Sequence, residues 1–347
     1  MGIKVLVVDD SATARAILTE ILLSDKEIQS VETAPDAYIA RDKIVKNPPD
    51  VICLDVEMPR MDGITFLKKI MLHMPIPVVM VSSLTQKGAE TTLDALEAGA
   101  VDFVAKPHTN IYDGVKEIHQ ELLDKVKNAT LANVKRDREK RVYKHLQYKT
   151  HLKETTQKLI AVGASTGGVE GLKEFLVQFP RNTPGMIIVQ HMPAKFTKQF
   201  AKRLNNLCEM DIKEAEDGDV VNIGQVLLAQ GDNHMVLRQS GHRYYIQIGG
   251  GKKISGHRPS VNVMFNSVSK VAGANAIGVI LTGMGSDGAN GLLNMRKAGS
   301  MTFGQDKKSS VVYGMARVAN EIGGVVKEDS LEHLPSTILN YLETIKV

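Results

Sequence analysis

Apolar runs and helical patterns alternate along the first 126 residues of the chain. The alternation repeats about five times, and one of its helical segments, Ser11 to Leu23, begins with a serine that suits an N-cap. Strands that are apolar along their whole length are typical of sheets buried on both faces. The pattern therefore predicts an α/β domain, in which helices cover both faces of a parallel sheet.

Polar residues follow the predicted strands of this first domain. Asp9 and Asp10 follow the first strand, Asp55 follows a later one, and Ser82 and Lys106 end two more. Carboxylates bind hard divalent cations such as Mg²⁺, while a hydroxyl and a lysine can bind the oxygens of a phosphoryl group. These residues predict a site for Mg²⁺ and a phosphoryl group. The alternative is that each aspartate only caps the helix that follows it.

A later apolar run, residues 159–162, leads into Gly163-Ala-Ser-Thr-Gly167, which fits the G-x-S-x-G pattern. In that pattern a serine lies on a sharp turn between a strand and a helix, and residues 169–179 have the apolar face of such a helix. We expect Ser165 to lie exposed at the end of its strand, near helix N–H groups that suit an oxyanion. Similar turns also bind phosphate, so the motif alone leaves both interpretations open.

Two more apolar runs end in residues that complete the chemistry of a serine hydrolase. His191 follows residues 186–190, and Asp287 lies shortly after residues 276–282. Because ligands of open α/β sheets bind outside the carboxyl ends of the strands, Ser165, His191 and Asp287 are expected to converge there. Ser165 would attack an acyl carbon, His191 would transfer the proton, and Asp287 would orient the imidazole. Taken singly, His191 also fits a core histidine and Asp287 a turn residue.

The segment after residue 224 has a different pattern, with short strands that alternate in polarity. We interpret it as an antiparallel insertion, with strands at residues 225–229, 234–239 and 243–248. His257 and Arg258 follow it, and a helix is predicted over residues 262–272. Either His257 and Arg258 line a substrate cleft, or they belong to a solvated turn in which Ser260 caps the helix.

Length and composition place these two domains in an ordinary globular protein. The 347 residues are enough for two hydrophobic cores. No apolar run approaches the ~20 residues of a membrane span, and Asp9 and Asp10 come too early for a signal peptide. We therefore expect a cytoplasmic protein without membrane insertion. Cys53 and Cys208 are far apart in the sequence, which favours reduced thiols.

The basic character of the chain is confined to one segment. Residues 134–158 contain nine Lys or Arg and three acidic residues, a net charge of +6, whereas the whole chain has a net charge of +4. The remaining residues therefore sum to −2 (4 − 6), which argues against a basic face for nucleic acid. This segment is interpreted as a solvated linker, with a docking site for an acidic partner as the alternative.

The motifs of the first domain resemble those of the receiver domain of two-component response regulators. They are Val-Val-Asp9-Asp10-Ser, Leu-Asp55-Val-Glu-Met-Pro59, Met61-Asp-Gly63, Val-Ser82-Ser and Ala105-Lys106-Pro107. The resemblance implies a flavodoxin-like, doubly wound fold and phosphorylation of Asp55 by a chemotaxis histidine kinase. It also implies that Asp9, Asp10 and Asp55 bind Mg²⁺ and that Ser82 and Lys106 sense the phosphoryl group.

The motifs of the second domain resemble those of the chemotaxis response regulators that are protein-glutamate methylesterases. They are Gly163-Ala-Ser165-Thr-Gly-Gly168, Gln190-His191-Met-Pro193, Glu214-Ala-Glu-Asp-Gly218, His257-Arg-Pro-Ser-Val261, Leu281-Thr-Gly-Met-Gly-Ser-Asp287-Gly288 and Val311-Val-Tyr-Gly-Met315. The resemblance implies hydrolysis of glutamate methyl esters, and deamidation of glutamines, on the cytoplasmic helices of chemoreceptors. It assigns catalysis to Ser165, His191 and Asp287 without a cofactor, and it places Thr166 and the backbone of Met284 in the oxyanion loop.

This resemblance also sets the expected domain boundaries. We expect a receiver over residues 1–126, a basic hydrophilic linker over residues 127–156, and a methylesterase domain over residues 157–347. Two alternative functions are a nucleic-acid-binding regulator and a nucleotide-binding oxidoreductase. The second domain lacks a helix-turn-helix signature and a G-x-G-x-x-G motif, which argues against both.

Overall fold

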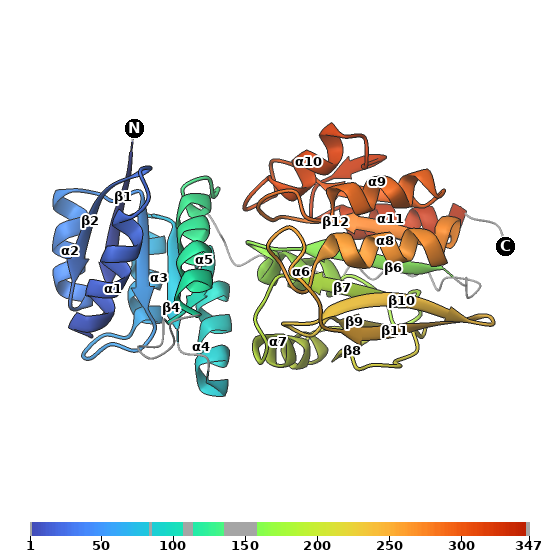
Figure 1. Cartoon of the computed structure of the whole chain (residues 1–347), viewed down its shortest axis with the longest axis horizontal. Helices are drawn as coiled ribbons and strands as arrows, with labels where there is room; N and C mark the ends of the chain where they lie inside the picture. Colours follow the sequence, from blue (N-terminus) through green and yellow to red (C-terminus); the bar gives the residue numbers. More distant parts are fainter. Residues whose placement is uncertain (1, 83–84, 107–113, 135–157, 345–347) are drawn as a thin grey trace. The chain divides into compact units, whose positions relative to one another are not determined.

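The computed structural model describes residues 2–82, 85–106, 114–134 and 158–344. The chain divides into two compact units, residues 1–140 and 141–347, and each is an α/β domain (Figure 1). Residues 135–157, which hold most of the predicted basic linker, lie outside the described residues.

Unit 1 contains a five-stranded parallel sheet with the strand order β2-β1-β3-β4-β5. Its strands are β1 (Ile3–Val8), β2 (Ile28–Ala34), β3 (Val51–Asp55), β4 (Val78–Ser82) and β5 (Asp102–Ala105). Its helices are α1 (Ala12–Leu23), α2 (Ala37–Lys46), α3 (Gly63–His73), α4 (Gln86–Glu97) and α5 (Gly114–Ala129). The chain passes from β1 to β2 in one direction and from β3 to β5 in the other, so right-handed crossovers place helices on both faces. The predicted doubly wound fold is confirmed.

Side chains at the helix starts explain where these helices begin. Ser11 caps α1 by accepting a hydrogen bond from the Ala14 N–H, as the sequence predicted. Asp36, Asp62 and Thr85 cap α2, α3 and α4 in the same way. Asp9 and Asp55, in contrast, lie at the ends of β1 and β3 and are not the cap residues of these helices.

Unit 2 contains a seven-stranded parallel sheet with the strand order β14-β13-β12-β6-β7-β9-β8. Its strands are β6 (Leu159–Ala164), β7 (Met186–Gln190), β8 (Asp211–Glu214), β9 (Gln225–Leu228), β12 (Ala276–Ile280), β13 (Met301–Gln305) and β14 (Lys327–Asp329). Its helices are α6 (Gly168–Leu176), α7 (Phe196–Asn205), α8 (Val261–Val271), α9 (Ala289–Lys297), α10 (Met315–Glu321) and α11 (Leu334–Thr344), with a 3₁₀ turn η1 (Gly273–Asn275). From β6 the chain continues to β7 on one side, and from β12 it continues to β13 on the other. The ends of β6 and β12 therefore form a topological switch point, which is where open sheets bind ligands.

An antiparallel hairpin, β10 (His234–Ser240) and β11 (Arg243–Gly249), is inserted between β9 and α8, as predicted. The prediction was wrong about residues 225–229. Residues 225–228 form β9, which pairs in parallel with both β7 and β8 inside the main sheet. Val226 to Leu228 are fully buried, and a short apolar run of this kind fits either pairing direction. The choice depends on the partner strand, which is distant in the sequence.

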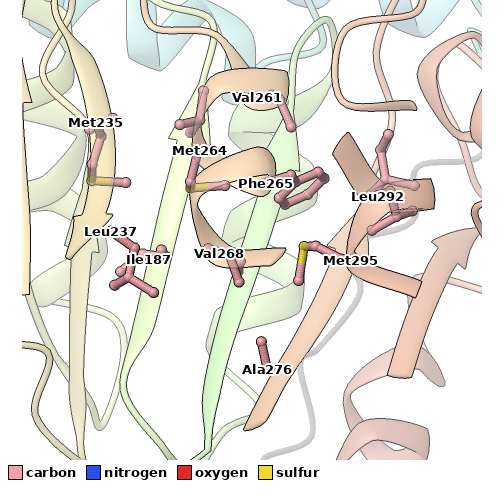
Figure 2. Close-up of a cluster of buried hydrophobic side chains, with 14 of the residues drawn as sticks. Ile187, Met235, Leu237, Val261, Met264, Phe265, Val268, Ala276, Leu292 and Met295 are labelled. Atoms are coloured by element: carbon pink, nitrogen blue, oxygen red, sulfur yellow. The ribbon is translucent and has the colours of Figure 1, made fainter. Parts of the chain in front are cut away.

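Helix α8 connects the hairpin, the sheet and α9 through a single hydrophobic core (Figure 2). Met264, Phe265 and Val268 project from α8 and are completely buried. Gly291 of α9 allows close contact, because a Cβ atom there would lie 2.6 Å from the Phe265 Cβ. Figure 2 shows Leu292 and Met295 of α9 on one side of this helix and Met235 and Leu237 of β10 on the other.

We predict that Phe265→Ala destabilises unit 2 by about 3–5 kcal/mol, because it removes a buried ring that the packed helices cannot replace. Equilibrium urea unfolding, followed by circular dichroism, measures this change. Lys270→Ala, at the exposed end of the same helix, is the control and should change the free energy of unfolding by less than ~0.5 kcal/mol. Equal losses in the two variants would contradict the assignment of this core.

Candidate active site and acidic pocket

Ser165 lies on the tight turn between β6 and α6. Its N–H donates to the Thr282 carbonyl at 3.0 Å, and its carbonyl accepts from the Gly168 N–H at 2.6 Å. Gly167, the N-cap residue of α6, has a positive φ of 77°, and a Cβ atom there would lie 2.5 Å from the Val311 Cβ. The turn is therefore packed between Thr282, after β12, and Val311, after β13. Ser165 is 9% exposed, so the expectation of an exposed serine was wrong: the loop after β12 passes close to it at Gly283.

Ser165, His191 and Asp287 form one hydrogen-bonded network. His191 Nδ1 lies 3.1 Å from Ser165 Oγ, and His191 Nε2 lies 2.9 Å from Asp287 Oδ2. Because Asp287 can only accept when ionised, Nε2 donates its proton and Nδ1 is left to accept the serine hydroxyl proton. The structure brings together three residues that the sequence separates by up to 122 positions (287 − 165).

The carboxylate of Asp287 lies at the N-terminus of α8. It accepts from the Val261 N–H at 2.7 Å and the Asn262 N–H at 3.1 Å, and from the Ser260 hydroxyl at 2.8 Å. Burial would raise the pKa of Asp287, but the hydrogen bond and charge interaction with His191, together with the Ser260 and Asn262 contacts, lower it below its ordinary value. Asp287 thus stays ionised although it is only 1% exposed.

Two nearby residues had only a partial signal in the sequence. Ser260 caps α8 as one interpretation expected, by accepting from the Val263 N–H, and it also donates to Asp287. The His257 ring stacks on the His191 ring with centroids 3.7 Å apart and planes 11° apart. The sequence placed His257 near a possible cleft but contained no signal for this stacking.

Gln190 also supports the site, although the sequence singled it out only within the Gln190-His191-Met-Pro193 motif and gave it no role. Its side-chain amide donates to the Ser165 carbonyl at 3.0 Å and to the His191 carbonyl at 3.2 Å. The amide therefore fixes the backbone of the serine turn relative to that of the histidine loop. The signal that could have found it is its position at the end of β7, immediately before His191.

Thr166 and Met284 lie on the two loops that meet at Ser165. The Thr166 carbonyl accepts from the Thr282 hydroxyl at 3.0 Å, which joins the serine turn to the loop after β12. Gly283, next to Met284, passes so close that a Cβ atom there would lie 2.7 Å from the Ser165 Cβ. Both loops therefore lie next to Ser165.

The polar residues of unit 1 gather at the carboxyl end of its sheet. Oxygen atoms of Asp9, Asp10 and Asp55 all lie within 4.8 Å of one another. Lys106 Nζ lies 3.0 Å from Asp9 Oδ2 and 2.8 Å from Asp55 Oδ2. Asp10, Asp55, Lys106 and Ser82 line a cavity of about 240 Å³. Three carboxylates at this spacing suit a hard divalent cation, and Asp10, which is exposed, lies on the solvent side.

Burial shifts the protonation of this pocket. It raises the pKa of Asp55 to about 6, with the Asp9 charge adding to the effect and the contact with Lys106 opposing it. The interactions with Asp55 and Asp9 raise the pKa of Lys106, against the opposing effect of burial. Ser82 is buried, and its hydroxyl donates to the Gly88 carbonyl of α4 at 3.3 Å. The serine that faces the pocket is thereby tied to the next helix.

Known proteins match both units. Residues 160–338 match the CheB methylesterase family, and residues 5–116 match the response regulator receiver domain. A protein-glutamate methylesterase/protein-glutamine glutaminase of Sulfurimonas denitrificans is 57% identical over 352 residues, with 100% of both chains covered. One of Escherichia coli is 50% identical over 341 residues, covering 97% of this chain and 96% of its own. The solved methylesterase catalytic domain of Thermotoga maritima CheB has a TM-score of 0.52 at 34% identity, covering 53% of this chain and 98% of its own.

The fold and these matches define a response regulator whose output domain is an α/β hydrolytic domain. The chain belongs to the CheB methylesterase family. The resemblance drawn from the sequence motifs is confirmed, which sets aside the nucleic-acid-binding and oxidoreductase alternatives. Among the described residues, no helix is long and apolar enough to cross a membrane.

We predict that Asp55 titrates near pH 6 in the absence of divalent cations. Because its folded pKa lies above the ordinary value of 3.8, the folded receiver binds the proton more tightly than the unfolded chain does. Stability should therefore fall as the pH rises from about 4 to above 6. The carboxyl ¹³C shift of Asp55, identified by its absence in Asp55→Asn, measures the midpoint. A midpoint at or below pH 4 would show that Lys106 outweighs burial.

Proposed function

We propose that this chain is a serine hydrolase that removes methyl esters from glutamate side chains of chemoreceptors for sensory adaptation, and that its receiver activates it when phosphorylated. The same site deamidates glutamines to glutamates. The single observation that carries the chemistry is the Ser165–His191–Asp287 network, with its proton positions fixed by the ionised Asp287. The family supplies the substrate class.

In this mechanism the Ser165 Oγ forms a bond to the ester carbonyl carbon, and its proton passes to His191 Nδ1. The backbone at Thr166 and Met284 stabilises the resulting oxyanion. When the intermediate collapses, the C–O bond to the methoxy group breaks, and the proton on His191 leaves with methanol. Water then attacks the acyl-serine by the same route, which releases glutamate. A glutamine side chain follows these steps with ammonia as the leaving group.

The acidic pocket of the receiver supports the regulatory half of the proposal. Asp9 and Asp10, with Asp55, are suited to hold Mg²⁺, which would neutralise the charge of an incoming phosphoryl group. Asp55 is the phosphoryl acceptor from a histidine kinase. In this proposal Lys106 and Ser82 bind the phosphoryl oxygens, which is supported by the contact of Lys106 with Asp55 and by Ser82 lining the same cavity.

We predict that Ser165→Ala and His191→Ala each lower methanol release from methylated receptor membranes by several orders of magnitude without unfolding the protein. Because the three residues act as a unit, the double variant should be little slower than either single variant. Asp287→Asn should lose less than Ser165→Ala, since Asp287 orients the imidazole and does not attack. Turnover by His191→Ala near that of the wild type would refute this assignment.

A second prediction concerns regulation. A small-molecule phosphodonor should label the wild type and increase methanol release only when Mg²⁺ is present, because the carboxylates and the phosphoryl group otherwise repel each other. Asp55→Asn should abolish labelling and activation while it retains basal release. Ser82→Ala is the matched control: it keeps the acceptor, so labelling persists while activation weakens. Normal labelling of Asp55→Asn would place the acceptor elsewhere.

A further inference from the structure

The loop between β11 and α8, residues 250–260, lies directly against the candidate active site. His257 stacks on His191, and Ser260 donates to Asp287. The loop is also tied to the start of β10, because the buried His234 accepts from the Ser260 N–H at 3.2 Å and donates to the Lys252 carbonyl at 2.9 Å. The end of this loop at residues 257–260 therefore belongs to the site. The β10–β11 hairpin fixes the position of the loop through His234.

The outer part of the loop is a small hairpin of its own. Ile254 and His257 exchange two backbone hydrogen bonds of 3.0 Å, with Ser255 and Gly256 between them at φ values of 53° and 81°. Two central residues with positive φ are typical of a type I′ turn. Arg258 Nη1 donates to the Gly251 carbonyl at 2.5 Å and braces the base of this turn. We call residues 251–258 the active-site hairpin.

The side chains at the outer edge of the active-site hairpin point to a partner. Lys252 and Lys253 are exposed, and Ile254 is 42% exposed, which is high for a large apolar residue. Hydrogen bonds of Ile254 with His257 and of Lys252 with His234 hold the backbone at this edge, so its exposed side chains start from a defined position. Two cations beside an apolar side chain suit a segment that carries both carboxylates and an apolar contact.

The charge of the surrounding sequence favours the same partner. Residues 233–286 contain six Lys or Arg and no Asp or Glu, and the next carboxylate, Asp287, is buried in the catalytic network. Two negative charges lie nearby: Asp232 contacts the active-site hairpin through its backbone N–H, and the Asp217 carboxylate accepts from the Ile248 N–H at 2.8 Å near the end of β11. Lys252, Lys253 and Arg258 of the hairpin outnumber them. The edge of the site formed by this hairpin therefore keeps a positive balance.

We propose that the active-site hairpin docks an acidic segment of the substrate protein, in which carboxylates that neighbour the target glutamate contact Lys252 and Lys253. This inference rests on the proposed function. Hydrolysis of an ester, or deamidation of a glutamine, leaves a carboxylate, so a segment with several modified positions becomes more acidic with each turnover. A cationic hairpin beside Ser165 holds such a segment while successive positions react. Exposed charges of this kind act mainly on association and on its salt dependence.

Two matched peptides test this proposal with the full-length protein, activated by a phosphodonor and Mg²⁺. Both contain one central glutamate γ-methyl ester, flanked by glutamates in the acidic peptide and by glutamines in the neutral one. At low salt, the wild type should show a kcat/KM about tenfold higher for the acidic peptide, expressed through KM, and the ratio should approach one in ~0.5 M salt.

The variant Lys252→Glu/Lys253→Glu should lower the acidic-to-neutral ratio of kcat/KM to one or below. The control is Lys270→Glu/Lys297→Glu, which has the same charge change in the last turns of α8 and α9. Those positions lie roughly 12–14 Å from the helix starts beside Asp287, because a helix rises about 1.5 Å per residue. The control should keep the wild-type ratio.

The outcomes separate the docking proposal from the proposed function. If the wild type hydrolyses both peptides with equal kcat/KM at low salt, or if both double variants lose the preference equally, docking by the active-site hairpin is wrong while the esterase assignment stands. If the wild type hydrolyses neither peptide although Ser165 reacts with a serine-directed phosphonate, the substrate class is wrong and the docking proposal falls with it.

Discussion

The buried charge of Asp287 is the constraint on which the geometry of the active site depends. A carboxylate that is 1% exposed stays ionised only if donors surround it, and here they come from the N-terminus of α8, from Ser260 and from His191. Because the ionised Asp287 accepts the Nε2 proton of His191, Nδ1 is the nitrogen that faces Ser165. The Phe265 core holds α8 in position, and the N-terminus of α8 holds Asp287. Asp287 in turn orients His191 toward Ser165.

Both units place their chemistry where the direction of strand order reverses. In unit 1 the reversal lies between β1 and β3, whose ends carry Asp9, Asp10 and Asp55. In unit 2 it lies between β6 and β12, which precede Ser165 and Asp287. Helices that leave in opposite directions open a crevice at such a point, so polar groups there reach solvent or substrate although the strands themselves are buried. The two sites then differ in electrostatics: Lys106 balances the carboxylates of one, and helix N–H groups balance that of the other.

The antiparallel insertion serves the site in unit 2 as much as the sheet does. His234 at the start of β10 is bonded to Ser260 and Lys252, so the same hairpin fixes the start of α8 and the exposed edge beside the catalytic histidine. The segment from β10 to the start of α8 therefore both supports the catalytic residues and exposes Lys252 and Lys253 to solvent.

The sequence alone determined the α/β class of both domains and the strand-end positions of Ser165, His191, Asp287 and the receiver aspartates, because apolar runs and the polar residues that end them are local patterns. It did not determine that β9 joins the parallel sheet, that Ser165 is covered, or that His191 uses Nδ1 toward the serine. It also had no signal for the His257 stacking. Each of these depends on contacts between segments that are far apart in the chain. A short apolar strand can pair in either direction, and an imidazole ring can present either nitrogen to a given neighbour. The choice is made in the folded protein, by the neighbouring strand in the first case and by the hydrogen-bond partners of the ring in the second.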